Sequence, residues 1–122
     1  MLEINLDKQT KIVTLEPHGA LTQDDFQSAV KAIDPSIEES GKLNGIIIYT
    51  KSFPGWDSFT ALTNHLKFVR EHHKKVSYVA FVTDSIIGDF GQKIANHFVQ
   101  ARVKHFNYKD LNSAKAWILE SE

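Results

Sequence analysis

The chain has 122 residues, of which 42% are hydrophobic and 24% are charged. This composition is typical of one globular domain and excludes a disordered, collagen-like or coiled-coil protein. Fourteen basic residues against fifteen acidic ones leave no positive excess that would indicate nucleic-acid binding. The chain has no cysteine, which excludes disulfides, thiolate zinc sites and cysteine nucleophiles. No apolar run approaches the roughly 18 residues of a membrane span, and no secretory signal is visible, so we expect a cytoplasmic protein.

The first part of the chain predicts a β-hairpin followed by a helix. Apolar residues alternate with polar ones over 2–6 and again over 12–15, which is typical of two half-buried strands. The polar residues 7–10 between these strands predict the hairpin turn. Thr22 then predicts the N-cap of a helix that ends near Pro35, because the residue before a proline disfavours helical backbone.

The remainder of the chain predicts strands that alternate with helices. Residues 45–49 and 76–82 are apolar without alternation, which suits central strands covered on both faces, and residues 103–108 predict a further strand. Apolar residues at helical spacing follow each of these strands, the last set over 111–118. The expected order is β-β-α-β-α-β-α-β-α. This order predicts an α/β fold in a single domain over residues 1–122, with a mixed, mostly parallel sheet flanked by helices.

The motifs indicate neither a metal site nor a catalytic site. His65 and His72 would lie about 10 Å apart along a helix, too far to share an ion, and His72 and His73 diverge, so we expect no metal ligand set and no cofactor. The segment Gly55-Trp56-Asp57-Ser58 lacks the second glycine of a nucleophile elbow. Phosphate-binding glycine motifs are also missing. These observations predict a binding protein rather than an enzyme.

Two loops carry the most informative residues. The segments after the strands at 45–49 and 76–82 hold five large apolar side chains, at Phe53, Trp56, Ile86, Ile87 and Phe90. The carboxyl ends of parallel strands meet at one edge of the sheet, where α/β proteins bind ligands. These side chains either cap the core or line a site for an apolar small molecule, a lipid or a membrane surface. In the second case, Lys51 at the rim would meet a carboxylate or phosphate.

Asp57 and Ser58 begin the helix that follows the first of these loops. Unpaired backbone N–H groups and the helix dipole at such a position favour a phosphoryl group on Ser58. An ordinary N-cap is the more common explanation of the same two residues.

Several segments together resemble the SpoIIAA-like family, which belongs with the STAS domains (sulfate transporter and anti-sigma factor antagonist). They are the hairpin, Gly45-Ile46-Ile47-Ile48, Phe53-x-Gly55-Trp56, Val79-Ala80-Phe81-Val82-Thr83-Asp84, and Lys104-His105-Phe106 followed by Ala114-x-Ala116-Trp117-Ile118. The resemblance implies a mixed sheet flanked by helices and a binding role. It also implies similarity in fold to the lipid-carrying CRAL-TRIO domains.

The expected function is therefore a non-enzymatic STAS-like module that binds an apolar small molecule or lipid and associates peripherally with the inner membrane surface through its apolar loops. The alternative is a protein-interaction module, similar to an anti-sigma factor antagonist, that is switched by phosphorylation of Ser58 beside Asp57. Phe59, Thr60 and Ala61 depart from the small residues that follow the phosphorylated position in those antagonists. A protein partner and a homodimer both stay open.

Overall fold

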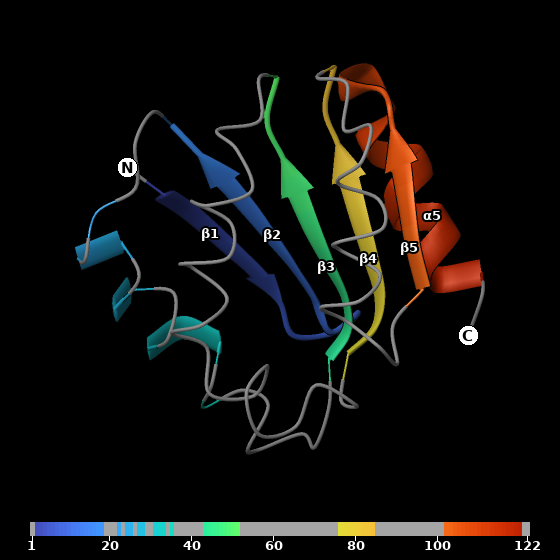
Figure 1. Cartoon of the computed structure of the whole chain (residues 1–122). Helices are drawn as coiled ribbons and strands as arrows, with labels where there is room; N and C mark the ends of the chain where they lie inside the picture. Colours follow the sequence, from blue (N-terminus) through green and yellow to red (C-terminus); the bar gives the residue numbers. More distant parts are fainter. Residues whose placement is uncertain are drawn as a thin grey trace.

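The computed structural model describes residues 2–18, 43–51, 76–84 and 102–120, together with positions 22, 24, 25, 27, 28, 31–33 and 35. The strands in these segments form one five-stranded sheet in the order β1-β2-β3-β4-β5 (Figure 1). The strand bounds are Leu2–Asp7 for β1, Ile12–Pro17 for β2, Leu43–Tyr49 for β3, Val76–Val82 for β4 and Arg102–Phe106 for β5. A 3-10 turn, η2 (Tyr108–Asp110), leads into helix α5 (Leu111–Glu120).

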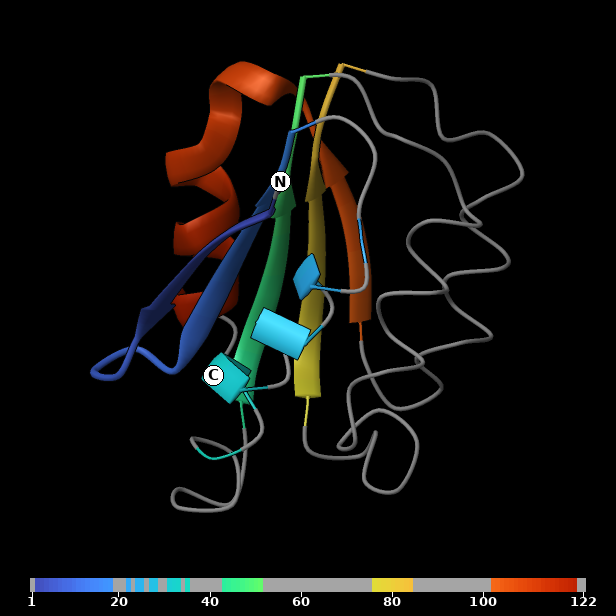
Figure 2. The same ribbon diagram turned by 90° about the vertical axis from the view of Figure 1, so that its left-hand side faces the viewer.

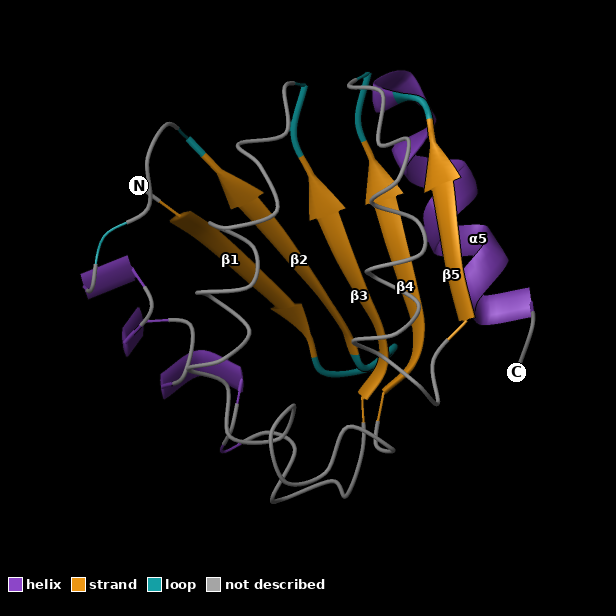
Figure 3. Cartoon of the chain, viewed as in Figure 1, coloured by secondary structure: helices purple, strands orange, loops and turns teal. Residues whose placement is uncertain are grey.

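The sheet is mixed and mostly parallel, as the sequence predicts. β1 pairs antiparallel with β2, and the three other neighbouring pairs are parallel (Figure 3). The described residues between 24 and 35 are helical. The α/β class is thereby confirmed. The helices expected between β3 and β4 and between β4 and β5 lie outside the described residues.

The turn of the hairpin is organised by Asp7. Its Oδ1 atom accepts hydrogen bonds from the N–H groups of Gln9 at 2.9 Å and Thr10 at 3.2 Å. These bonds, that of Thr10 first, stabilise the carboxylate and lower the pKa of Asp7 below its ordinary value. Lys11 ends the turn in the left-handed region, with φ 58°, and its N–H donates to the carbonyl of Asp7 at 2.8 Å. The polar stretch therefore turns the chain largely through one aspartate.

The helical segment after β2 begins at Thr22, as predicted. The N–H of Thr22 donates to Oδ2 of Asp25 at 2.8 Å, and the N–H of Asp25 donates to Oγ1 of Thr22 at 3.3 Å, which is the reciprocal pattern of a capping box. The first of these bonds is the main reason why the pKa of Asp25 lies below its ordinary value. Oδ1 of Asp25 also accepts from the N–H of Leu2 at 3.2 Å, so one carboxylate joins the helical segment to β1.

Successive residues of the central strands are buried on opposite faces of the sheet. The strand register places one buried set on each face: Val13, Leu15, Ile46, Ile48, Val79 and Phe81 on the first, and Ile12, Ile47, Tyr78, Ala80 and Val82 on the second. Helix α5 covers the second face, where Ala114 and Ile118 join the core (Figure 2). The continuous apolar runs in the sequence are explained by this two-sided burial.

Helix α5 packs closely on β3 because position 45 is a glycine. A Cβ atom on Gly45 would lie 2.6 Å from Cδ1 and 3.0 Å from Cγ2 of Ile118. Both residues are buried. The glycine therefore leaves the space that the isoleucine fills.

Trp117 continues this packing towards β5. Its ring meets that of Tyr78 edge-on, with 5.2 Å between the centroids, and lies 5.8 Å from the ring of Phe106. The Nζ atom of Lys104 lies 5.1 Å from the centroid of Phe106, within the range of a cation–π contact. The outer strand is thus tied to α5 mainly through aromatic side chains.

The last strand is shorter than the sequence predicts. The expected strand over 103–108 ends at Phe106, and Tyr108 instead begins η2. The reason is that the N–H of Tyr108 donates to Oδ1 of Asp84 at 3.1 Å, while the N–H of Asp110 donates to the carbonyl of Asn107 at 2.9 Å. The alternation of apolar residues alone does not reveal these two bonds.

Candidate functional site

The carboxyl ends of β3 and β4 lie side by side at the upper edge of the sheet in Figure 1. Tyr49 pairs with Val82 at the end of the ladder, and the N–H of Thr50 donates to the carbonyl of Val82 at 3.1 Å. One step further, the N–H of Asp84 donates to the carbonyl of Lys51 at 3.3 Å. The two segments that the sequence assigns to the ligand site therefore leave the sheet from adjacent points.

Buried Thr83 joins the ends of three strands at this edge. Its Oγ1 donates to the carbonyl of Lys51 at 3.3 Å, and its N–H donates to the carbonyl of Phe106 at 3.0 Å. Nε2 of His105 donates to the carbonyl of Thr83 at 2.8 Å, which places the imidazole proton on that nitrogen. These hydrogen bonds connect the ends of β3, β4 and β5 at this edge of the sheet.

Lys51 is the predicted site residue that the structure describes, and it is exposed at the end of β3. The remaining predicted site residues lie outside the described residues: Phe53, Trp56, Ile86, Ile87 and Phe90 for the apolar site, and Asp57 and Ser58 for the phosphorylation site. Their roles stay predictions, anchored by the positions of Lys51 and Asp84.

Two stacked tyrosines lie beside these connected strand ends. The rings of Tyr49 and Tyr108 are parallel within 3°, with centroids 4.7 Å apart. A hydrogen bond between the two side chains, followed by partial burial, raises the pKa of the Tyr49 phenol, and the charge of Glu16 adds to this effect. The parallel register of β2 and β3 places Tyr49 and Glu16 on the same face of the sheet. Tyr49 and Tyr108 are far apart in sequence, and no sequence motif indicates this pair.

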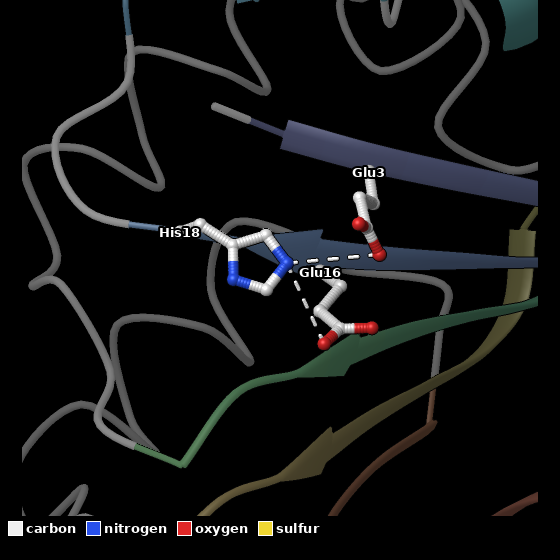
Figure 4. A group of neighbouring side chains, drawn as sticks. All are labelled: Glu3, Glu16 and His18. Atoms are coloured by element: carbon white, nitrogen blue, oxygen red, sulfur yellow. Dashed lines mark ion pairs between the residues drawn. The ribbon is translucent and has the colours of Figure 1, made fainter.

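Glu3, Glu16 and His18 form a cluster at the β1–β2 end of the same edge (Figure 4). Nε2 of His18 lies 3.6 Å from Oε2 of Glu3 and 3.6 Å from Oε2 of Glu16. The search for histidine pairs at helical spacing missed this cluster. Two signals could have found it: His18 follows Glu16 by two residues at the end of β2, the spacing of side chains on one face, and the hairpin register pairs Glu16 with Glu3.

A small cavity of about 110 Å³ lies at the opposite, hairpin end of the sheet, between α5 and the first two strands. It is lined by Asn5, Asp7, Thr10, Ile12, Thr14, Lys115 and Leu119. Ligand pockets for drug-sized molecules usually enclose about 300–1,000 Å³. This cavity is therefore too small to enclose a lipid chain.

Leu119 is 41% exposed, and among the described residues it is the one large apolar side chain on the surface.

The helices within the described segments offer no candidate for a membrane crossing, since none is both long and apolar enough.

Comparisons with known proteins agree with the fold. The family model described as SpoIIAA-like matches residues 12–119. The crystal structure of an uncharacterized protein from Shewanella loihica PV-4 with a SpoIIAA-like fold is similar to this chain, with a TM-score of 0.61 and 20% sequence identity. The similarity covers 97% of this chain and 92% of that chain. No curated protein matches the sequence. The family match over most of the chain, together with the mixed sheet and its covering helix, places this chain in the SpoIIAA-like family.

Proposed function

We propose that this protein is a non-enzymatic binding module that takes an apolar small molecule or lipid at the carboxyl edge of its sheet. The observation that carries the proposal is the 3.3 Å hydrogen bond from the N–H of Asp84 to the carbonyl of Lys51. This bond sets the starts of the two apolar segments beside each other, at the edge where α/β proteins bind ligands.

The five apolar residues are all close in sequence to this pair of anchors. Phe53 and Trp56 follow Lys51 within five positions, and Ile86, Ile87 and Phe90 follow Asp84 within six. An extended chain advances at most about 3.6 Å per residue, so none of the five can lie more than roughly 22 Å from its anchor. Each would gain about 1.5–3 kcal/mol by leaving water, which an acyl chain or bilayer surface would provide.

Lys51 supplies the positive charge for an acidic headgroup. Its side chain is exposed at the end of β3, whereas the carboxylate of Asp84 already accepts from the N–H of Tyr108 at 3.1 Å. A fatty acid or anionic lipid would therefore place its carboxylate or phosphate near Lys51 and its chain among the apolar residues. Peripheral contact of the same loops with a membrane follows from this arrangement.

The experiment is a titration of the full chain with a fluorescent long-chain fatty acid, followed by displacement with an unlabelled fatty acid and with the alcohol of equal chain length. We expect saturable binding, tighter for the acid than for the alcohol. Lys51→Gln should remove this preference while retaining binding of the alcohol. Absence of saturable binding to either compound would rule out the proposal.

A second candidate is a protein-interaction module switched by phosphorylation of Ser58. The family match and the Asp57-Ser58 pair, which is similar in sequence to the phosphorylated position of anti-sigma factor antagonists, support this candidate. Incubation of the protein with cell extract and ATP, followed by intact-mass analysis, tests this candidate. A phosphate that is lost in Ser58→Ala supports the switch, and an unmodified mass under every growth condition excludes it.

A further inference from the structure

The cluster of Glu3, Glu16 and His18 is built by the register of the hairpin. Glu3 lies directly opposite Glu16 in the antiparallel pair, and His18 follows Glu16 by two residues along the same strand direction. Figure 4 shows the imidazole of His18 turned towards both carboxylates. One ligand atom from each residue lies within 4.8 Å of the other two. Three side chains, from β1, from β2 and from the residue that follows β2, thus lie close together.

The separations within the cluster suit a shared ion better than direct hydrogen bonds. Nε2 of His18 is 3.6 Å from an Oε2 atom of each glutamate, which is too long for a hydrogen bond. Ligand atoms at zinc bond lengths and tetrahedral angles are separated by about 3.4 Å. The two measured distances are therefore near the edge length of a metal-centred tetrahedron.

The charges of the cluster also favour a bound metal ion. Two carboxylates placed directly opposite each other on neighbouring strands repel. A divalent cation between them would replace this repulsion with attraction to both. The side chains of Glu3, Glu16 and His18 are 55%, 29% and 47% exposed, so an ion could enter from solvent and keep a water ligand.

We propose that Glu3, Glu16 and His18 bind a divalent transition-metal ion of the zinc class. One imidazole nitrogen and two carboxylate oxygens form a donor set that such ions accept, with water in the remaining position. The site lies at the β1–β2 end of the sheet and is independent of the apolar-ligand proposal. It also differs from the expectation of no metal site, which rested on histidine pairs within helices.

Calorimetric titration of the full chain with Zn²⁺ near neutral pH tests the proposal. We expect one ion per chain from this site, and each of Glu3→Gln, Glu16→Gln and His18→Gln should weaken it. Changes that touch only the surroundings of a metal ligand cost about 10–100-fold in affinity, so loss of a ligand should cost at least tenfold. Glu3 and His18 are exposed and Glu16 is half-buried, so these variants should keep the far-ultraviolet circular dichroism of the parent.

His105→Gln is the matched control, because His105 is an exposed histidine of β5 that lies outside the cluster, with its Nε2 hydrogen-bonded to the carbonyl of Thr83. It should bind Zn²⁺ as the parent does.

Nitrogen-15 spectra of the imidazoles should show that Zn²⁺ shifts the ring nitrogens of His18. The proposal is overturned if the parent binds no Zn²⁺, if the three cluster variants bind as tightly as the parent, or if saturation leaves His18 unshifted. The first of these results would leave the cluster as an ion pair only.

Discussion

Ile118 occupies the space that any side chain at position 45 would need, since a Cβ on Gly45 would lie 2.6 Å from its Cδ1 and 3.0 Å from its Cγ2. This relationship fixes how closely α5 approaches β3. It connects a glycine in a central strand to the C-terminal helix, two features that lie more than half the chain apart.

Gly45→Ala should destabilise the protein by about 1–3 kcal/mol, the usual cost of overpacking a core. Ile118→Val alone removes Cδ1, the atom that would lie closest to the new methyl group, and should cost about 0.5–1.5 kcal/mol. The double variant should be more stable than the sum of the two losses predicts, because the valine removes the shortest of the clashing contacts. Urea unfolding of the parent and the three variants measures this coupling, and strict additivity would contradict it.

Asn44 should contribute to stability through the turn of the hairpin. It is only 8% exposed, and its Nδ2 donates to the carbonyl of Thr10 at 2.7 Å. Asn44→Ala leaves that carbonyl without this donor, so we expect a loss of about 1–3 kcal/mol. Gln9→Ala, at an exposed turn position, should stay within about 0.5 kcal/mol of the parent. Equal unfolding midpoints for the two variants would show that the Asn44 bond adds nothing.

Asp25, which caps the helical segment, should stabilise the protein less at low pH. The pKa of Asp25 is lowered from 3.8, chiefly by the hydrogen bond from the N–H of Thr22, so the folded state binds this proton less readily than the unfolded state. Its contribution to stability is therefore fully present above pH 3.8 and is lost as the pH falls through the folded pKa.

Carbon-13 spectra of the side-chain carboxyl groups can follow this titration. We expect Asp25 to titrate below 3.8 in the parent, and its pKa to rise in Thr22→Ala, where the hydroxyl of the cap is removed. A parent value at or above 3.8 would show that the cap does not form in solution.

The fold was largely predictable because its signals are local or depend on simple periodicity. Unbroken apolar runs identified β3 and β4, and Thr22 identified the helix start. The end of β5 was missed because it depends on a bond between Tyr108 and Asp84, which are far apart in sequence.

The candidate site was less predictable, because part of it also depends on contacts between residues that are separated in sequence. The adjacency of Lys51 and Asp84 follows from placing β3 beside β4, so the topology anticipates it. The Glu3–Glu16–His18 cluster depends on the exact register of the hairpin, and a shift of one residue would separate its members onto opposite faces. Residue spacing along the chain does not determine that register.

Two substitutions test whether the apolar segments form the ligand site. Trp56→Ala and Ile87→Asp should each weaken binding to fatty acids and anionic liposomes, because each removes apolar surface from the proposed site. Both should leave the unfolding midpoint nearly unchanged, since neither position belongs to β3 or β4. Unfolding of both variants would mean that the two side chains cap the core instead.

Leu119→Asp is the matched control for this comparison. It removes an exposed apolar side chain beside the cavity at the hairpin end of the sheet, away from Lys51 and Asp84. We expect its binding to fatty acids and liposomes to equal that of the parent. Weaker binding in this variant, with normal binding by Trp56→Ala and Ile87→Asp, would move the site to the other end of the molecule.

Native mass spectrometry of the freshly purified protein shows whether the chain holds an apolar ligand. An apolar ligand held between the two segments should survive gentle purification and appear as an added mass, which organic extraction would release as a lipid or fatty acid. The same adduct should be reduced in Trp56→Ala and retained in Leu119→Asp. A bare mass for the parent, together with no uptake of added fatty acid in the same spectrum, would show that the protein has no such ligand site.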